Sequence, residues 1–401
     1  MSIPRTCDPL GRALRRTIPG RPFGVRFWDG TIVEAPGPTF EVRRPAALAH
    51  VLRAPSALGL GRAYVEGSLD VDDIDAAAKV VGEWRPPPLS LLDRARIGAG
   101  LVLAALPGAL ARRPKLELSL RGERHTRARD EAAVRYHYDA GNEFFGLFLD
   151  EAMVYSCAVY SRGARTLEEA QRAKLDLIAT KLGLKPGMSV LDVGCGWGAF
   201  AIHAAREYGV RVTGLTLSPA QAGLARARAA DAGLAERVEI LVCDYRDLRA
   251  GPFDAISSIG MSEHVGEARI DDYARSLCGL LRPGGVLLNH AIAAIDGDEE
   301  THGSEFTMRY VFPDGELLTL SRVQLAFERA GLRTDHVEGF RGDYSKTLTE
   351  WAKRLDERLR EAERLVGAER TRVWRLYLRG ARYGFDAGLN AVYQVRAHRP
   401  S

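Results

Sequence analysis

The chain lacks the features that define several large protein classes. Its 401 residues include only five cysteines, widely spaced and without a Cys-x-x-Cys pair: Cys7, Cys157, Cys195, Cys243 and Cys278. Neither a disulfide framework nor a zinc or other metal site is therefore predicted, and a reducing compartment is expected. The net charge of +4 is too balanced to indicate a nucleic-acid partner, although a local basic patch would still suit an anionic membrane.

Long hydrophobic runs are also missing. The longest, Ile97 to Ala111, is interrupted by glycine and proline and is too short to span a bilayer. No apolar segment of signal-peptide length follows the N-terminal arginines. Basic residues surround the run and the N-terminus: Arg94, Arg96, Arg112, Arg113 and Lys115, with Arg5, Arg12, Arg15 and Arg16. Two interpretations stay open, a segment resting on anionic lipid and a buried linker helix, and the poorly defined amphipathic pattern favours the second.

The pattern of elements divides the chain into three parts. Residues 1–84 read as a small α+β domain, with a hairpin over Phe23–Val33 turning at Asp29-Gly30 and helices over 45–52 and 61–66. Residues 85–125 read as a linker that follows three prolines and contains one apolar helix. Residues 126–401 form the predicted catalytic domain.

Helices and strands alternate through that last part. A capping box at Thr166 and Glu169 opens a helix that ends near Leu182. The apolar runs 188–193, 210–215, 238–242, 253–259 and 286–290 are predicted strands, and 199–208 and 219–232 are predicted helices. Such alternation predicts a parallel sheet covered by helices on both faces. Residues 347–385 are predicted to be helical, and 391–395 to form a last edge strand.

A glycine-rich turn lies where the first of these strands meets a helix. Asp192-Val193-Gly194-Cys195-Gly196-Trp197-Gly198 lacks the glycine three residues after Gly196 that would complete the G-x-G-x-x-G dinucleotide fingerprint. The next strand ends without the acidic residue that nicotinamide cofactor sites use for the ribose. The turn resembles motif I of class I S-adenosylmethionine (SAM) methyltransferases. This implies an α/β fold with a Rossmann-like, mostly parallel seven-stranded sheet, preceded by the small N-terminal domain.

Further segments resemble the cyclopropane-fatty-acyl-phospholipid synthases and the mycolic acid cyclopropane synthases. They cover residues 126–395 and are 136–145, 149–150, 153–158, 214–221, 258–266, 290–292, 310–315 and 343–348, with Trp351. Residues 58–67 resemble the phospholipid-acting branch, whose extra N-terminal domain looks like a lipid carrier. The chain departs from the family at Glu143, where Asp is frequent, and at Asp343, where His is frequent. Neither change removes an implied ligand, but both leave the product open.

The resemblance implies the cofactor SAM and the residues that bind it. These are Tyr155, Ser156, Asp192, Gly194, Gly196, Gly198, Thr216, Gln221, Asp244 and Tyr245. Asp192 is expected near the amino group, Gln221 at the ribose hydroxyls and Asp244 at the adenine. Taken alone, Asp244 is as readily a turn former and Tyr245 a core aromatic.

The reaction that the resemblance implies is addition of a one-carbon unit to a cis double bond in a phospholipid acyl chain. Attack on the activated methyl group leaves a carbocation, and ring closure needs a base in a site without water. In the family that base is bicarbonate, and the matching positions are Cys157, Glu263, His290, Ile292 and Tyr344. Tyr310 or Phe145 could stabilise the cation. Singly, Cys157, Glu263 and His290 also suit a buried thiol, a helix N-terminal carboxylate and a core histidine.

Several alternatives stay open. The same cation yields a methylene- or methyl-branched chain if the base removes a proton from a neighbouring carbon. A non-catalytic lipid- or SAM-binding protein and a methyltransferase for a free metabolite are the remoter alternatives. We expect a cytoplasmic enzyme that associates peripherally with the inner face of the membrane, and the resemblance suggests a homodimer.

Overall fold

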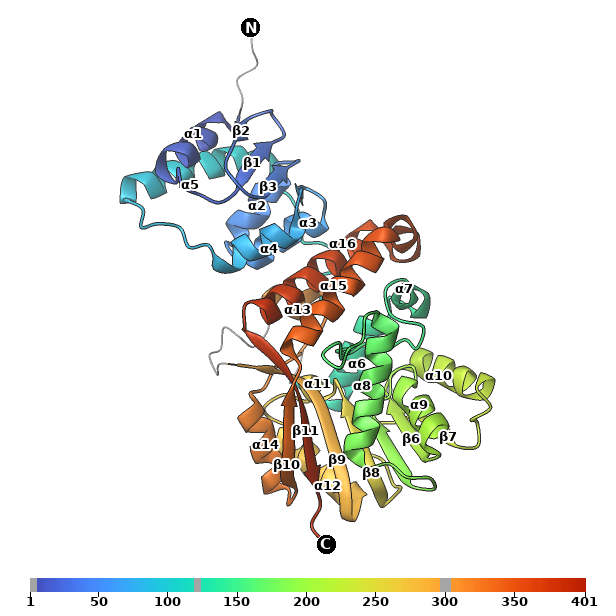
Figure 1. Ribbon diagram of the computed structural model, residues 1–401. Helices are drawn as coiled ribbons and strands as arrows, with labels where there is room; N and C mark the ends of the chain where they lie inside the picture. Colours follow the sequence, from blue (N-terminus) through green and yellow to red (C-terminus); the bar gives the residue numbers. More distant parts are fainter. Residues whose placement is uncertain (1–5, 119–123, 296–303) are drawn as a thin grey trace. The chain divides into compact units, whose positions relative to one another are not determined.

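The computed structural model describes residues 6–118, 124–295 and 304–401, so Arg5 lies outside the described residues (Figure 1). The chain forms two compact units. The first consists of Met1–Ser119, Ser304–Val311 and Val366–Tyr383, and the second of Leu120–Gly303, Phe312–Leu365 and Gly384–Ser401. Each unit is therefore built from three separate segments of the chain. The domain boundaries predicted near residues 84 and 125 stay a prediction.

The first unit combines a small sheet with helices. In chain order it contains α1 (Asp8–Thr17), β1 (Gly24–Phe27), β2 (Ile32–Val33), β3 (Thr39–Val42), α2 (Ala46–Arg53), α3 (Ala57–Val65), β4 (Leu69–Val71), α4 (Ile74–Glu83), α5 (Leu91–Ala105), the 3-10 helix η1 (Leu106–Gly108), α13 (Glu305–Tyr310) and much of α16 (Leu359–Asp386). The strand order is β2-β1-β3-β4. The antiparallel pairing of β1 with β2 confirms the predicted hairpin.

The later segments of the chain are built firmly into the first unit. Arg62 of α3 forms a buried ion pair with Glu117, whose carboxylate also accepts a hydrogen bond from the Tyr310 hydroxyl at 3.2 Å. Arg372 of α16 stacks its guanidinium 4.0 Å from the ring centroid of Tyr64. These contacts join residues that are up to about three hundred positions apart in the sequence.

Helix α5 packs its small residues, with Ile97 and Leu101, against the core of the unit and leaves its other large side chains exposed. Gly100 faces α1 so closely that a Cβ there would lie 3.0 Å from the Cα of Leu10, and Ala104 and Ala105 are buried in the core of the unit. Close helix packing requires small side chains at the contact. The opposite face of α5 and the residues that follow it carry large side chains that are 49–93% exposed: Leu91, Leu92, Val102, Leu103, Leu106 and Leu110. The buried-helix interpretation thus holds for one face of α5 only.

The second unit is organised around a seven-stranded sheet. Its elements are α6 (Arg127–Tyr138), α7 (Asn142–Gly146), α8 (Leu167–Leu182), β5 (Ser189–Val193), α9 (Ala199–Tyr208), β6 (Arg211–Thr216), α10 (Pro219–Asp231), β7 (Val238–Val242), β8 (Phe253–Ile259), α11 (Ser262–Val265), α12 (Ile270–Leu280), β9 (Leu281–Ala294), α14 (Leu320–Arg329), β10 (Arg333–Gly339), α15 (Arg341–Glu357) and β11 (Asn390–His398). The order is β10-β11-β9-β8-β5-β6-β7. Four pairings are parallel and the two that involve β11 are antiparallel, which confirms the predicted fold class.

Helices cover both faces of this sheet (Figure 1). Helices α8, α9 and α10 bury apolar side chains on one face, and α12 and α14 bury theirs on the other. The capping box at Thr166 and Glu169 is present at the start of α8, as predicted. No helix in the described part of the chain is both long and apolar enough to cross a bilayer.

The edge of the sheet differs from the prediction. The strand predicted over 391–395 is not an edge strand, because β11 lies between β9 and β10. Strand β10, Arg333–Gly339, was not predicted because most of its side chains are exposed and polar, so it lacks the apolar run of a central strand. The predicted C-terminal helix is two helices, α15 and α16, and Gly367 adopts a non-helical conformation within the second.

Candidate active site

The glycine-rich turn after β5 forms one wall of a cavity at the carboxyl ends of β5, β6 and β8. Gly194 has a φ of 78°, and a Cβ there would lie 2.5 Å from Cγ of Met261. Gly196 has a φ of 54° and open space around it. Positive φ angles favour glycine, and the missing side chains leave the backbone accessible to a ligand. The cavity occupies the position where open α/β sheets bind their ligands.

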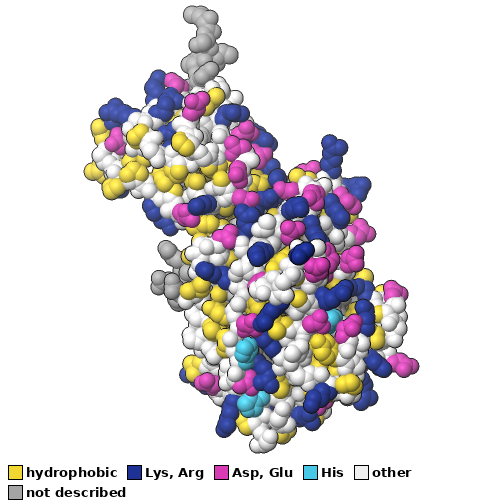
Figure 2. Space-filling view, in the orientation of Figure 1, with side chains coloured by type: hydrophobic (Ala, Val, Ile, Leu, Met, Phe, Trp, Pro, Cys, Tyr) yellow, Lys and Arg dark blue, Asp and Glu magenta, His cyan; other side chains and the backbone are white. Residues whose placement is uncertain are grey.

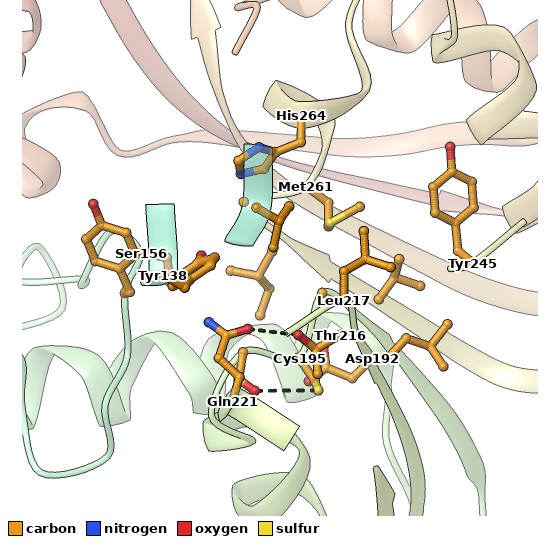
Figure 3. Close-up of a pocket in the computed structure, with 18 of the residues that line it drawn as sticks. Tyr138, Ser156, Asp192, Cys195, Thr216, Leu217, Gln221, Tyr245, Met261 and His264 are labelled. Carbon is orange, nitrogen blue, oxygen red and sulfur yellow. Dashed lines mark hydrogen bonds between the residues drawn. The ribbon is translucent and has the colours of Figure 1, made fainter. Parts of the chain in front are cut away.

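Nine of the ten predicted cofactor residues line this cavity: Tyr155, Ser156, Asp192, Gly194, Gly196, Thr216, Gln221, Asp244 and Tyr245. In Figure 3, His264 and Met261 lie across the cavity from Gln221 and Thr216. Gly198 is not one of the lining residues. A Cβ at Gly198 would lie 3.1 Å from that of Ala225, so this glycine allows α9 and α10 to pack closely.

Asp192 presents a buried carboxylate to the cavity. Its Oδ1 accepts a hydrogen bond from the Ser257 hydroxyl, whereas Oδ2 is buried without a hydrogen-bond partner among the described residues. Burial raises the pKa of Asp192 to about 6. The nearby Lys174 is fully buried and donates to the Ser156 hydroxyl at 2.9 Å, and burial lowers its pKa to about 8. Lys174 supplies positive charge beneath the cavity, and the sequence analysis did not identify it.

Gln221 and Thr216 form a second polar wall. The Thr216 hydroxyl donates to Oε1 of Gln221 at 2.8 Å and accepts from the amide of Ser218 (Figure 3). Nε2 of Gln221 is left buried without a partner in the described part of the chain. An amide N–H₂ in this state suits a ligand hydroxyl, because leaving it unpaired is costly. The residues present therefore fit a ligand that carries both a cationic group, near Asp192, and hydroxyls, near Gln221.

Asp244 is held by an arginine that the sequence analysis did not identify. Arg246 donates to Oδ1 of Asp244 at 2.8 Å and also to Oδ2 of Asp130 on α6 at 2.9 Å. Burial acts to raise the pKa of Asp244, but the bonds from Arg246 lower it overall. The bridge fastens α6, which contributes Asp130 and Tyr138 to the cavity, to the loop after β7.

The five residues matched to the bicarbonate site lie next to the cavity rather than in its lining. Glu263 of α11 accepts a hydrogen bond from the Ile292 amide through Oε1 at 2.8 Å. The carbonyl of His290 accepts from the amide of Gly260, which does line the cavity. Cys157 directly follows the lining residue Ser156.

Phe340 connects three of these residues. Its carbonyl accepts from the Tyr344 amide at 3.1 Å and lies 3.8 Å from Sγ of Cys157, and its ring stacks on that of His290 with centroids 6.4 Å apart. Tyr344 packs edge-on against Trp351, and the ring of Trp351 is 5.2 Å from that of Tyr155 in the cavity wall. Cys157, His290 and Tyr344 thus surround one aromatic residue behind the cavity.

Two buried polar atoms in this cluster have no hydrogen-bond partner among the described residues, Oε2 of Glu263 and Nε2 of His290. Burial raises the pKa of Glu263 to about 7, against the opposing effect of the Ile292 amide. Burial, with Lys174 and Lys181 nearby, holds the pKa of His290 well below its usual value, so the ring is neutral. Oε2 of Glu263 and Nε2 of His290 are therefore both available to form hydrogen bonds with a small ligand.

The two aromatic residues suggested for cation stabilisation have different surroundings. Phe145 packs 5.4 Å from Tyr155 and 5.1 Å from Trp197, both of which line the cavity. Tyr310 belongs to the first unit, where it stacks on Phe306 and bonds Glu117. Phe145 is therefore the candidate that the structure of the second unit places beside the cavity.

Comparison with known proteins identifies the family. The family described as mycolic acid cyclopropane synthetase matches residues 125–395. The chain is 39% identical to the "Probable fatty acid methyltransferase" of Pseudomonas putida (94% of this chain, 92% of the relative) and 34% identical to the cyclopropane-fatty-acyl-phospholipid synthase of Escherichia coli K12 (88% and 86%). The crystal structure of mycolic acid cyclopropane synthase CmaA1 complexed with SAH and CTAB superposes with a TM-score of 0.64 at 35% identity, covering 67% of this chain and 98% of that one. The chain belongs to the mycolic acid cyclopropane synthetase family of SAM-dependent methyltransferases.

Proposed function

We propose that the protein adds a methylene group from SAM across a cis double bond in a phospholipid acyl chain and so forms a cyclopropane ring. The observation that carries the proposal is the pair of buried, unpartnered atoms on Glu263 and His290, set behind a cavity whose own unpartnered atoms, on Asp192 and Gln221, suit SAM. Relatives named for fatty-acid methylation and for cyclopropane synthesis support an acyl chain as the substrate.

Asp192 and Gln221 would hold the cofactor. The carboxylate of Asp192 suits the ammonium group and the amide of Gln221 suits the ribose hydroxyls. When bound, SAM supplies a methyl group activated by a sulfonium. The adenine pocket would be formed by Tyr245 and the Asp244–Arg246 pair.

The aromatic cluster would protect the acyl chain during the reaction. Attack by the alkene leaves a carbocation on the chain, which water would trap. Phe145 and Trp351 each pack against Tyr155, which lines the cavity, and would exclude water from that side. Their ring faces would also stabilise positive charge through the ring quadrupole.

A bound bicarbonate ion would remove the proton that closes the ring. Bicarbonate has both an O–H donor and acceptor oxygens, so it matches the carboxylate Oε2 of Glu263 and a histidine N–H at the same time. When bound, the ion would supply the base that takes a proton from the new methyl group, whose C–H electrons would form the third ring bond. By the family resemblance, the Tyr344 hydroxyl and the backbone of Cys157 complete the site. The Ile292 amide is already bonded to Glu263 and would act through it.

Branched-chain formation is the second candidate, supported by the name of the Pseudomonas putida relative. It shares the carbocation but loses a different proton. Lipids from cells that express the protein and receive trideuteromethyl-labelled methionine would separate the outcomes. A cyclopropane retains two deuterium atoms and resists ozonolysis, whereas a branched alkene is cleaved by ozone and a saturated methyl branch carries two additional hydrogens. Any branched product in place of the ring contradicts cyclopropanation.

The membrane contact would be the outward face of α5 and η1. Burying leucine side chains in lipid is favourable, and arginines beside them attract anionic headgroups. The exposed Leu103 and Leu106 lie in α5 and η1, and Leu110 follows in the turn after η1. Arg94 and Arg96 belong to α5 itself, and α1, which packs against α5 at Gly100, carries further arginines. Figure 2 shows hydrophobic and basic side chains intermixed over the region of α1 and α5. This face supports peripheral binding to an anionic membrane that contains the substrate.

A further inference from the structure

A row of polar side chains crosses the edge of the large sheet and ends at His290. Strand pairing sets Glu338 of β10 opposite Gln394 of β11, and Gln394 opposite His290 of β9. The three strands lie side by side (Figure 1). Lys181, in the last turn of α8, reaches the same row and contacts both Glu338 and Gln394.

The chemistry of Lys181 fixes the orientation of the Gln394 amide. Nζ of Lys181 lies 2.6 Å from Oε1 of Gln394 and 2.6 Å from Oε2 of Glu338. An ammonium group only donates hydrogen bonds, so the amide must present its oxygen to Lys181. Its N–H₂ group must then face the other way. That group lies 3.2 Å from Nδ1 of His290, and the whole Gln394 side chain is buried.

The orientation of Gln394 in turn fixes the proton on His290. An amide N–H₂ donates, so Nδ1 of His290 must accept and cannot carry a hydrogen. The neutral ring then carries its proton on Nε2, the atom that is buried without a partner among the described residues. A neutral imidazole of this tautomer is a hydrogen-bond donor at Nε2 and has no lone pair there to act as a base.

We propose that Lys181 and Gln394 are positioning residues that hold His290 in the Nε2–H tautomer, so that it donates to the anion in the active site and does not itself remove the substrate proton. The inference rests on the proposed function for its catalytic consequence, but the tautomer is a property of the protein alone. Burial lowers the pKa of Lys181, and the Glu338 carboxylate 2.6 Å away opposes that shift by favouring the ammonium form.

The chain offers a matched pair of variants. Lys181 and Arg162 both form an ion pair with Glu338 at 2.6 Å, but among the described contacts only Lys181 reaches Gln394. Arg162→Met therefore removes a cation from Glu338 without releasing the amide. Lys181→Met removes the constraint that orients Gln394. Gln394→Glu keeps the size of the side chain and replaces the donor with an acceptor, which requires a hydrogen on Nδ1 of His290.

The tautomer is measured by ¹⁵N NMR of histidine-labelled enzyme without substrate, with the His290 signals assigned by their loss in His290→Asn. We expect Nε2–H in the native chain and in Arg162→Met, a mixture in Lys181→Met, and Nδ1–H in Gln394→Glu. Nδ1–H in the native chain, or an unchanged tautomer in Gln394→Glu, would overturn the inference. An equal response of Arg162→Met and Lys181→Met would overturn the role of Lys181.

Turnover adds a second readout. Gln394→Glu should lower kcat roughly 100-fold, because His290 would no longer hold the anion in position beside the reacting methyl group, while KM for SAM is unchanged. A reversed tautomer with unchanged kcat would overturn the catalytic role of the donor. If the native chain has the Nε2–H tautomer but makes no cyclopropane from unsaturated phospholipid vesicles with SAM and bicarbonate, the proposed function fails and the tautomer assignment stands.

Discussion

The carboxylate of Glu263 accepts a hydrogen bond from the backbone amide of Ile292 at 2.8 Å and leaves its second oxygen buried without a partner among the described residues. A buried carboxylate with one unmet acceptor is unfavourable for folding. Such groups persist where a site needs them, and here the carboxylate is bonded to β9, the strand that also carries His290. The cost should be measurable.

Glu263→Gln should stabilise the protein at alkaline pH while abolishing turnover. Burial raises the pKa of Glu263 from 4.5 to about 7, so the folded state holds the proton more tightly and stability falls as pH rises through that window. The penalty is absent below pH 4.5 and complete above pH 7, where it amounts to roughly 3 kcal/mol. Thermal melting at pH 5 and pH 8 tests this, with the exposed Glu357→Gln as control. An equal shift at both pH values would contradict the assignment.

Gly194→Ala should weaken SAM binding by tenfold or more. The added Cβ would lie 2.5 Å from Cγ of Met261, which pushes that side chain into the cavity, and the φ of 78° adds strain. Gly196→Ala carries the strain of a positive φ without the contact and should bind SAM more tightly than Gly194→Ala. Adding Met261→Ala should restore much of the affinity. Calorimetric titration with SAM measures each variant, and a double variant no better than Gly194→Ala would exclude the steric explanation.

The affinity for SAM should depend on the ionisation of Asp192. Its pKa is about 6 in the folded chain, so affinity is complete at higher pH and falls about tenfold per unit as pH drops well below that value. Lys174 lowers this pKa, and Lys174→Met should therefore move the midpoint upward. Binding titrations from pH 5 to pH 8 reveal the midpoint, with the exposed Lys185→Met as control. A midpoint that Lys174→Met leaves in place would contradict the coupling.

Replacing Leu103, Leu106 and Leu110 with serine should release the protein from anionic vesicles. Each leucine contributes on the order of 1.5 kcal/mol or more when it enters lipid, so the triple variant should bind at least about 100-fold more weakly. Leu325→Ser and Leu365→Ser, at other exposed leucines, should have no effect. Co-sedimentation with phosphatidylglycerol vesicles at low and high salt tests this. Equal loss in both sets, or binding insensitive to salt, would argue against this face.

The sequence predicted the centre of the sheet well because its strands are continuous apolar runs. β7 and β8 have the predicted bounds, and the glycine-rich turn after β5 indicated the cofactor end of the sheet. β10 lacked that signal, since its side chains alternate poorly and face solvent. The sequence left open whether the apolar segment at α5 is exposed or buried, because its orientation is set by the close approach of α1 at Gly100.

The residues that bind the cofactor and the anion could be named from the resemblance, but the residues that orient those side chains could not. Lys174, Lys181 and Arg246 look like ordinary surface cations in the sequence. Their roles come from partners brought near by folding, and Lys181 and Gln394 are 213 positions apart. Buried polar contacts of this kind leave no periodic signal in a single sequence.

The first unit is assembled from segments far apart in the chain, and this determines when it can fold. Its core segments near the N-terminus contact 304–311 and 366–383, and Gly82 lies against the ring of Tyr383. During synthesis these late segments leave the ribosome only after most of the second unit has been made. The N-terminal part must therefore wait, incomplete, for nearly the whole chain. Cutting the gene near residue 120 would not yield an independent module, since both products would lack surfaces that the other half supplies.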